Sequence, residues 1–361
     1  MNAFYRLATV IAALFVTHAM AGAATAQTAG VAPIAACTSP DQKIDEAGFI
    51  AIGGIQQWVT IKGDSCANPV ILVLHGGPGN TLSPYADNIY GAWQKHFTLV
   101  QWDQRGAGMT FGRNPPAEGE TLTIQRMRDD GIELAAYLAQ HLGKPKIIVM
   151  SSSWSSILGV YMVKARPDLF YAYLGASQIV GYRINQTDTY AHLLRLTHAA
   201  GDTAGIAVLE AQGAPPWTNP RSSGAVRKIV RKYEALTTDP EPGSWWQPAP
   251  AYATDQARAD YSSGEDYSYI QFVGMHGDGM YSGVDLPKLG TTFDLPVFIV
   301  AGAQDLLTAP EIARDYFDSL TAPQKAFVLV PRAGHDPNQA KVDAEFTLLE
   351  DTIMPLTGAT K

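Results

Sequence analysis

A cluster of serines around one tryptophan is the part of the sequence that most directly suggests chemistry. The run SSSWSS occupies residues 151–156, after an apolar run typical of a strand (146–150) and before one typical of a helix (157–162). A nucleophilic serine must be exposed on a turn and close to hydrogen-bond donors that stabilise an oxyanion. The alternative is a polar loop whose serines cap the following helix.

Ser153 is the serine that a strand-to-helix turn would present. In the nucleophile elbow G-x-S-x-G, small residues stand two places before and after the serine because chain segments crowd there. Centring this frame on Ser153 puts Ser151 and Ser155 at the two glycine positions. Serine is the next small residue, so the replacement is tolerable although each Cβ adds crowding. We predict Ser153 as the nucleophile, with Ser151 and Ser152 in the turn and a helix that begins near Trp154.

Two later strand ends supply an acid and a base in a matching order. Asp305 is the first carboxylate after the apolar run at residues 296–300, and His335 follows the run at 326–330. In an α/β-hydrolase the chain order is Ser, Asp, His. Ser153 would attack, His335 would take and return its proton, and Asp305 would fix the imidazole tautomer and stabilise imidazolium. Singly, Asp305 could be a helix cap and His335 a loop residue; together, the three residues favour catalysis.

A glycine turn supplies candidate oxyanion donors. The motif HGGPG at residues 75–79 directly follows an apolar, strand-like run. Glycines let backbone N–H groups approach a substrate oxygen closely, so we expect the donors to be the N–H groups of Gly77, with Gly76 as an alternative, and of Trp154. We expect His75 to shape the loop rather than to react.

The elements that must position these residues alternate between apolar strands and amphipathic helices. Strand-like runs lie at 48–53, 57–61, 69–74, 97–102, 146–150, 296–300 and 326–330, and helix-like runs at 84–96, 124–142, 310–320 and from 338 onward. Apolar strands that alternate with helices indicate a mostly parallel sheet covered by helices on both faces. We predict an α/β fold, the α/β-hydrolase fold, with its core at residues 27–180 and 291–361.

The alternation stops at residues 181–290. This segment is rich in aromatic residues and proline, and it has helix-like pieces at 189–200 and 224–236 but no clear buried strand. We expect a mainly helical cap inserted into the sheet domain.

Composition disfavours several classes of partner. The 361-residue chain has a formal net charge of −8, and only 17% of its residues are charged. Lysine and arginine form no stripe, so nucleic acid and anionic membrane are poor partners. His192 and His198 are six residues apart, on different faces of a helix, and no cluster resembles a zinc site. We expect no metal and no cofactor, and a small-molecule or short-peptide substrate.

The first 26 residues have the pattern of a signal peptide. One positive charge lies within residues 1–6, an apolar core of ten residues follows at 7–16, and small residues precede a cleavage site after Ala26. The core is too short for a permanent membrane anchor. A lipid-attachment box at residues 34–37 is the less favoured alternative. We expect an exported protein, periplasmic or secreted, in which Cys37 and Cys66 form a disulfide rather than two free thiols.

Three segments together resemble the proline iminopeptidase family. They are HGGPG at residues 75–79, DQRGAG at 103–108, and the serine–tryptophan elbow, which in that family usually reads GGSWGS. The resemblance covers the sheet domain at both ends of the chain. It implies an α/β-hydrolase that acts as a serine peptidase and removes an N-terminal residue, often proline. It implies a structural turn at DQRGAG and no catalytic role for Arg105.

The expected cap does not carry this resemblance. Family aminopeptidases hold the substrate's free ammonium with cap carboxylates, but none of the available acids lies in a family motif: Glu210, Glu234, Glu241, Glu265 and Asp266. For each of them a solvated helix face is the expected setting.

Three functions therefore stay open. The favoured one is an exported aminopeptidase that releases N-terminal proline or a small residue from peptides. The second is an esterase, amidase or lactonase on another small acyl substrate, because all of these enzymes share the acyl-enzyme path. The third is a non-catalytic binding protein that kept the fold.

Overall fold

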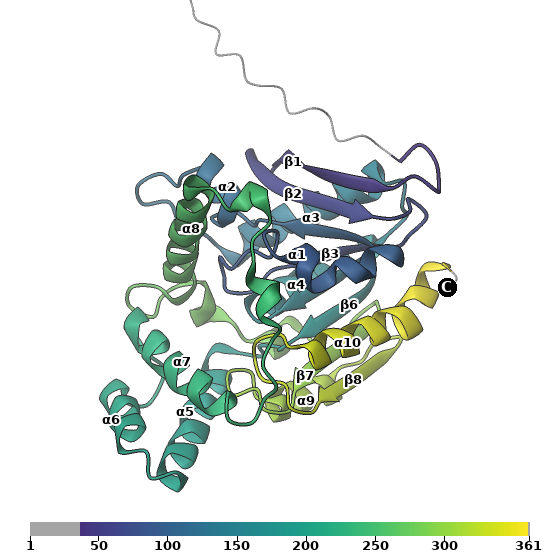
Figure 1. Cartoon of the computed structure of the whole chain (residues 1–361). Helices are drawn as coiled ribbons and strands as arrows, with labels where there is room; N and C mark the ends of the chain where they lie inside the picture. Colours follow the sequence, from purple (N-terminus) through teal and green to yellow (C-terminus); the bar gives the residue numbers. More distant parts are fainter. Residues whose placement is uncertain (1–36, 360–361) are drawn as a thin grey trace, which may run out of the picture. The chain divides into compact units, whose positions relative to one another are not determined.

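The core of the protein is a twisted, mostly parallel sheet. The computed structural model describes residues 37–359, so the predicted signal peptide at 1–26 lies outside the described residues. Within them the sheet has eight strands in the order β1-β2-β4-β3-β5-β6-β7-β8 (Figure 1). The pairs β1–β2 and β2–β4 are antiparallel, and all other neighbours are parallel. The strands are β1 (Ile44–Ile52), β2 (Ile55–Gly63), β3 (Val70–Leu74), β4 (Thr98–Trp102), β5 (Ile147–Ser152), β6 (Phe170–Ala176), β7 (Val297–Gly302) and β8 (Lys325–Val330).

Helices cover both faces of this sheet, because alternate strand residues point to opposite sides. Apolar side chains of one face, such as Leu72 and Val149, form one core with α3 (Ile124–His141), α4 (Trp154–Ala165) and α9 (Pro310–Ser319). Side chains of the other face form a second core with α1 (Ala86–Tyr90) and α10 (Gln339–Leu348). This arrangement confirms the predicted α/β class.

Two core elements are absent from the sequence-based prediction. Strand β6 combines tyrosines with small residues in FYAYLGA, a weaker apolar signal than its neighbours, and the buried Tyr173 hydroxyl there finds polar partners. The short helix α2 (Gly108–Arg113) follows the DQRGAG turn. In addition, β5 continues to Ser152, so Ser151 and Ser152 belong to the strand rather than to the predicted turn.

The segment between β6 and β7 holds the helices that we expect to form a cap. They are α5 (Tyr182–Ala199), α6 (Thr203–Gln212), α7 (Pro220–Glu234) and α8 (Asp255–Val273), with short 3₁₀ turns between them. The predicted pieces at 189–200 and 224–236 fall within or overlap α5 and α7, whereas α8 was not predicted. Helix α8 packs on α2. Next to this contact, Ser268 Oγ of α8 donates a hydrogen bond at 2.7 Å to the carbonyl of Gly106, which precedes α2. We call this segment, residues 181–290, the insertion.

A disulfide joins Cys37 and Cys66, as predicted. The bond connects the chain before β1 to the loop after β2, and the Cys66 N–H also donates to the Gln42 carbonyl at 2.8 Å. It closes a loop with a sequence separation of 29 residues. No helix within the described residues is both long and apolar enough to cross a membrane.

Two charged residues of α10 are buried beside the loop that carries His335. The Lys341 ammonium donates to Ser177 Oγ at 2.6 Å and to the His335 carbonyl at 3.0 Å. Glu345 lies one turn further along, and its Oε2 has no hydrogen-bond partner among the described residues. Burial raises the pKa of Glu345 to about 7, and the Lys341 charge opposes this only in part. Glu345 therefore destabilises the fold when it is ionised.

We expect Glu345→Gln to stabilise the protein at alkaline pH and to have little effect below pH 4.5. The pKa of Glu345 rises from an ordinary value of 4.5 to about 7 in the folded state. The native state thus binds an extra proton between these values, so wild-type stability falls as pH rises from 4.5 to about 7 and levels off above it. By pH 8 the variant should gain up to about 3 kcal/mol. Thermal melts in a pH series that starts below 4.5 and ends in the alkaline range measure this. The exposed Glu210→Gln is the control, and a pH-independent difference would contradict the prediction.

Candidate active site

Ser153 occupies the sharp bend between β5 and α4. Its backbone has φ 57° and ψ −124°, a positive φ that residues other than glycine rarely adopt. Strained backbone of this kind persists only where the surrounding structure holds it, and it is concentrated at functional sites. Helix α4 begins at Trp154, as the sequence predicts.

The serines at the two elbow glycine positions make internal hydrogen bonds. Ser151 Oγ donates to the Tyr173 hydroxyl at 3.1 Å on the neighbouring strand. Ser155 Oγ donates to the Leu74 carbonyl at 2.7 Å and accepts from the Ser152 N–H at 2.8 Å. Both residues are buried. Their hydroxyls therefore bind the elbow to adjacent strands, which explains how the chain accommodates serine where glycine is usual.

The structure brings Ser153, His335 and Asp305 together in one hydrogen-bonded chain. Ser153 Oγ lies 2.9 Å from His335 Nε2. On the other side of the ring, His335 Nδ1 lies 3.1 Å and 3.2 Å from the two Asp305 carboxylate oxygens. Asp305 follows β7 and His335 follows β8, at the carboxyl ends of parallel strands. This is the geometry that a serine nucleophile, a general base and an orienting acid require.

The local surroundings of Asp305 keep it ionised. Its Oδ1 accepts hydrogen bonds from the Leu307 and Thr308 N–H groups at 2.9 Å and 2.7 Å, and Oδ2 accepts one from Thr308 Oγ1 at 2.5 Å. Burial alone would raise the pKa of Asp305. The charge and hydrogen bond of His335, the charge of Lys341 and the Thr308 hydroxyl together outweigh burial and hold that pKa well below its usual range.

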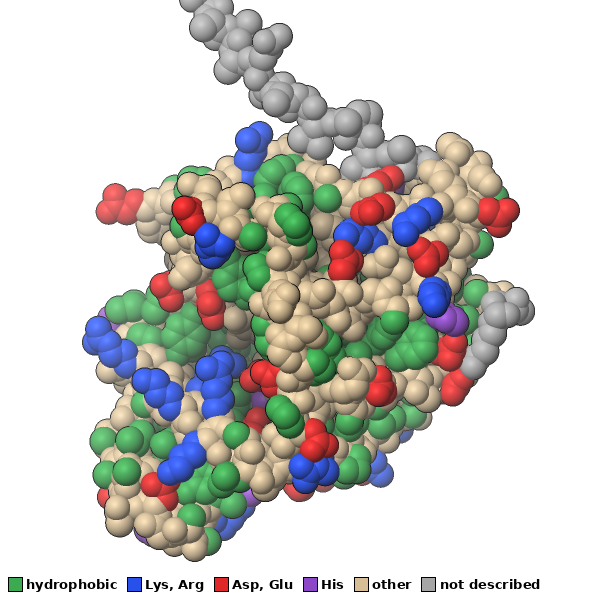
Figure 2. All heavy atoms as spheres, viewed as in Figure 1, with side chains coloured by type: hydrophobic (Ala, Val, Ile, Leu, Met, Phe, Trp, Pro, Cys, Tyr) green, Lys and Arg blue, Asp and Glu red, His purple; other side chains and the backbone are tan. Residues whose placement is uncertain are grey.

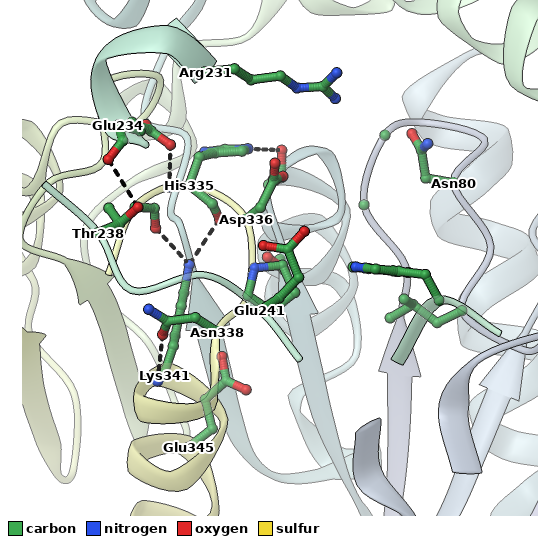
Figure 3. Close-up of a pocket in the computed structure, with 18 of the residues that line it drawn as sticks. Asn80, Arg231, Glu234, Thr238, Glu241, His335, Asp336, Asn338, Lys341 and Glu345 are labelled. Atoms are coloured by element: carbon green, nitrogen blue, oxygen red, sulfur yellow. Dashed lines mark hydrogen bonds between the residues drawn. The ribbon is translucent and has the colours of Figure 1, made fainter. Parts of the chain in front are cut away.

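Glu234, at the end of α7, lies against both loops of this arrangement. Its Oε1 accepts from the Leu306 N–H at 2.8 Å. Its Oε2 accepts from the His335 N–H at 3.1 Å (Figure 3). Gly334 makes this possible, because a Cβ there would lie 2.6 Å from Glu234 Oε2. Burial and the nearby Asp305 charge raise the pKa of Glu234. The expectation of a solvated helix face is therefore wrong for Glu234, since packing of α7 on the core buries it.

The glycine turn faces Ser153. A Cβ on Gly76 would lie 3.5 Å from the Ser153 Cβ, and Gly77 has a φ of 107°. Both glycines line a cavity with Ser153. The Trp154 N–H opens α4, and N–H groups of a first helical turn have no acceptor within their helix. Gly76 and Gly77 thus line the same cavity as Ser153, and Trp154 follows Ser153 in the chain, so all three predicted donor residues lie near the bend.

His75 and the DQRGAG turn are structural. Burial lowers the pKa of His75 to about 4, so its ring is neutral. Its Nδ1–H donates to the Gly76 carbonyl at 2.9 Å, while Nε2 accepts from the Gln104 N–H at 3.2 Å. Arg105 binds Asp130 at 2.7 Å, in agreement with the structural role that the resemblance implied.

Two cavities meet at Ser153. The larger, of about 720 Å³, is lined by polar and charged side chains of the core and of the insertion, among them Asn80, Arg231, Glu234 and Glu241 (Figure 3). Glu265 also lines it. The smaller, of about 100 Å³, is mainly apolar, with Trp217, Val226, Phe272 and Tyr281 in its wall. Ser153, His335, Gly77 and Arg227 line both cavities. A substrate can therefore place groups on two sides of Ser153.

Sequence reasoning did not assign roles to the insertion residues at this site. The large cavity includes Glu234, Glu241 and Glu265, whereas Glu210 and Asp266 are exposed and do not line either cavity. Helix α7 has a strongly amphipathic pattern, but its periodicity does not reveal which charged end residue turns inward. No group of three or more His, Cys, Asp or Glu residues within residues 37–359 could hold a metal ion.

Comparisons with known proteins agree with this architecture. No protein-family model matches the chain. The chain is 27% identical over 296 residues to the probable aminopeptidase YbaC of Bacillus subtilis, and this match covers 80% of this chain and 90% of the relative. It is 23% identical over 292 residues to a proline iminopeptidase of Lactobacillus delbrueckii subsp. lactis, a match that covers 80% of this chain and 91% of that relative.

A solved structure extends the likeness to the fold. The proline iminopeptidase of Mycobacterium smegmatis superposes with a TM-score of 0.61 at 18% sequence identity, over 88% of this chain and 100% of that one. The chain is thus a hydrolase with the α/β-hydrolase fold, similar to proline iminopeptidases over most of its length.

Proposed function

We propose that this protein is a serine aminopeptidase that releases N-terminal proline or a small residue from short peptides. The observation that supports this most is the continuous hydrogen-bonded chain from Ser153 Oγ through His335 to Asp305. The named relatives, an aminopeptidase and a proline iminopeptidase, suggest which bond such a site would cleave.

In the proposed mechanism, Ser153 Oγ attacks the carbonyl carbon of the scissile peptide bond. His335 Nε2 accepts the Ser153 proton and then donates it to the leaving nitrogen, while Asp305 stabilises the imidazolium. The N–H groups of Gly77 and Trp154 stabilise the oxyanion, with Gly76 as the alternative to Gly77. The products of this half-reaction are a Ser153 acyl-enzyme and a shortened peptide, and water activated by His335 then releases the amino acid.

Carboxylates in the large cavity support a substrate with a free amine. Glu241 and Glu265 line this cavity together with Ser153. Glu265 is held in place by Asn80, whose Nδ2 donates to its Oε1 at 2.8 Å. A charged ammonium prefers such partners, and an uncharged ester or lactone has no need of them. We propose Glu265, assisted by Glu241, as the amine-binding residue.

Export is part of the proposal. The signal-like pattern at residues 1–26 suggests it, and the Cys37–Cys66 disulfide supports it, because disulfides persist mainly in oxidising compartments.

A fluorophosphonate probe should label the wild-type protein at Ser153. Ser153→Ala should abolish labelling, because the Ser153 hydroxyl is the one that lies at hydrogen-bond distance from His335 Nε2, the nitrogen that would accept its proton. Ser151→Ala and Ser155→Ala should still be labelled, since those hydroxyls are bonded within the elbow. In-gel fluorescence and mass spectrometry of the labelled peptide measure this. Labelling that persists in Ser153→Ala would place the nucleophile elsewhere, and an unlabelled wild type would favour a binding protein.

Hydrolysis should require a free α-amine. We expect activity on prolyl or alanyl anilides and none on the same substrates with an acetylated amine. Glu265→Gln should raise KM for the free-amine anilide by about tenfold or more, because one charge-assisted contact is lost. Initial rates measure both effects. Asp266→Asn, which neutralises an exposed carboxylate on the same helix, is the control. Equal rates on free and acetylated substrates would favour an esterase or amidase instead.

Glu234 acts as a positioning residue in the proposed enzyme. It accepts backbone N–H groups from the Asp305 loop and the His335 loop, so it fixes their separation and ties α7 to them. Misplacement of a catalytic group by a fraction of an ångström slows the chemical step more than it weakens binding.

We therefore expect Glu234→Gln to lower kcat by about tenfold or more while KM changes less. The glutamine amide keeps one acceptor oxygen, but its NH₂ group would face a backbone N–H. The kcat from steady-state kinetics and the rate of fluorophosphonate labelling should both fall. Glu210→Gln, an exposed change on α6, is the matched control. A rise in KM with unchanged kcat would assign Glu234 to substrate binding instead.

A further inference from the structure

Two arginines of α7 face the site from the insertion. Arg227 and Arg231 are four residues apart, so they lie on the same side of the helix. Both line the large cavity, and Arg227 also lines the small one. Arg231 extends from α7 toward the open part of the large cavity, on the side of Asn80 (Figure 3). In Figure 2, basic side chains gather beside a hollow in the surface.

Neither arginine is paired with a carboxylate within residues 37–359, although acidic residues line the same cavity. Other arginines of the chain do have such partners: Arg105 binds Asp130, Arg166 binds Asp168, and Arg332 binds Asp239. The nearby acids are in part already engaged, since Glu234 accepts two backbone N–H groups and Glu265 accepts from Asn80. The Arg227 and Arg231 guanidinium groups are therefore available to an anion that enters from outside.

The small cavity places Arg227 and Ser153 around one shared space. Both residues line this cavity, whose volume is only about 100 Å³. An anionic group bound to Arg227 would therefore share the cavity with the carbonyl that Ser153 attacks. In a dipeptide, the α-carboxylate of the second residue is the anionic group nearest to that carbonyl.

We infer that Arg227, assisted by Arg231, binds the free α-carboxylate of the residue that leaves, so that dipeptides are the preferred substrates. The inference rests on the proposed aminopeptidase function and narrows its substrate class. The planar guanidinium suits a carboxylate because it can donate two parallel hydrogen bonds. A dipeptide then has its ammonium near Glu265 and its carboxylate near Arg227, and Ser153 lies between the two ends.

The test compares Pro-Ala with its C-terminal amide, Pro-Ala-NH₂, in which a neutral amide of similar size replaces the negatively charged carboxylate. For wild type we expect kcat/KM to be about tenfold higher for the acid than for the amide, as one charge-assisted interaction would give. Arg227→Met should reduce this ratio to near one, and Arg231→Met should reduce it in part. Arg227→Lys should restore part of it, because the charge returns without the planar geometry.

The ratio of kcat/KM for the acid to that for the amide tests carboxylate binding separately from the aminopeptidase activity itself. A variant that merely loses stability or active-site geometry loses acid and amide hydrolysis equally, so its ratio stays high. Lys228→Met, an exposed change on the same helix outside both cavities, should keep the wild-type ratio. A wild-type ratio near one, or a ratio that survives Arg227→Met and Arg231→Met together, overturns the inference. Absence of hydrolysis of both prolyl and alanyl anilides by wild type would instead overturn the aminopeptidase function.

Discussion

The hydrogen bond between Ser153 Oγ and His335 Nε2 joins residues 182 positions apart, and the rest of the site depends on what makes it possible. Strands β5, β7 and β8 run parallel, so the loops that follow them emerge at one edge of the sheet. Strands β5 and β7 are buried, the edge strand β8 is partly buried, and backbone pairing with their neighbours holds all three in register. The three side chains thus converge because of sheet register, before any direct contact among them is considered.

Local contacts then limit where each loop can sit. The Lys341 ammonium, on α10 of the core, donates to the His335 carbonyl. The Glu234 carboxylate, on α7 of the insertion, accepts from the His335 N–H. Both groups are buried charges, which are costly unless they are hydrogen-bonded. They are placed where backbone groups of the histidine loop would otherwise lack partners. The site is therefore held by charged side chains from elements on both sides of it.

The sheet domain could be predicted from sequence because its signals are local. Fully apolar strands, a glycine turn and small residues at the elbow each fix the nearby backbone, and the strand ends mark where Ser153, Asp305 and His335 must lie. The inward position of Glu234 could not be predicted. It depends on how α7 packs against two loops 72 and 101 residues further along the chain, as its hydrogen bonds to Leu306 and His335 show. Helix α8 was missed for a related reason, since its polar sequence is stabilised by contact with α2 rather than by an apolar stripe.

The elbow shows how the same physical constraint can be met by different residues. Glycine is usual beside the nucleophile because a Cβ would crowd neighbouring strands. Here Ser151 and Ser155 add that Cβ, and their hydroxyls compensate through bonds to Tyr173 and the Leu74 carbonyl. Each added hydroxyl thus has a buried acceptor and leaves no unsatisfied polar atom. The Ser153 hydroxyl is directed instead to an imidazole beside two cavities. The proposed nucleophile of this cluster is therefore distinguished by its contact with His335, which the sequence motif alone does not contain.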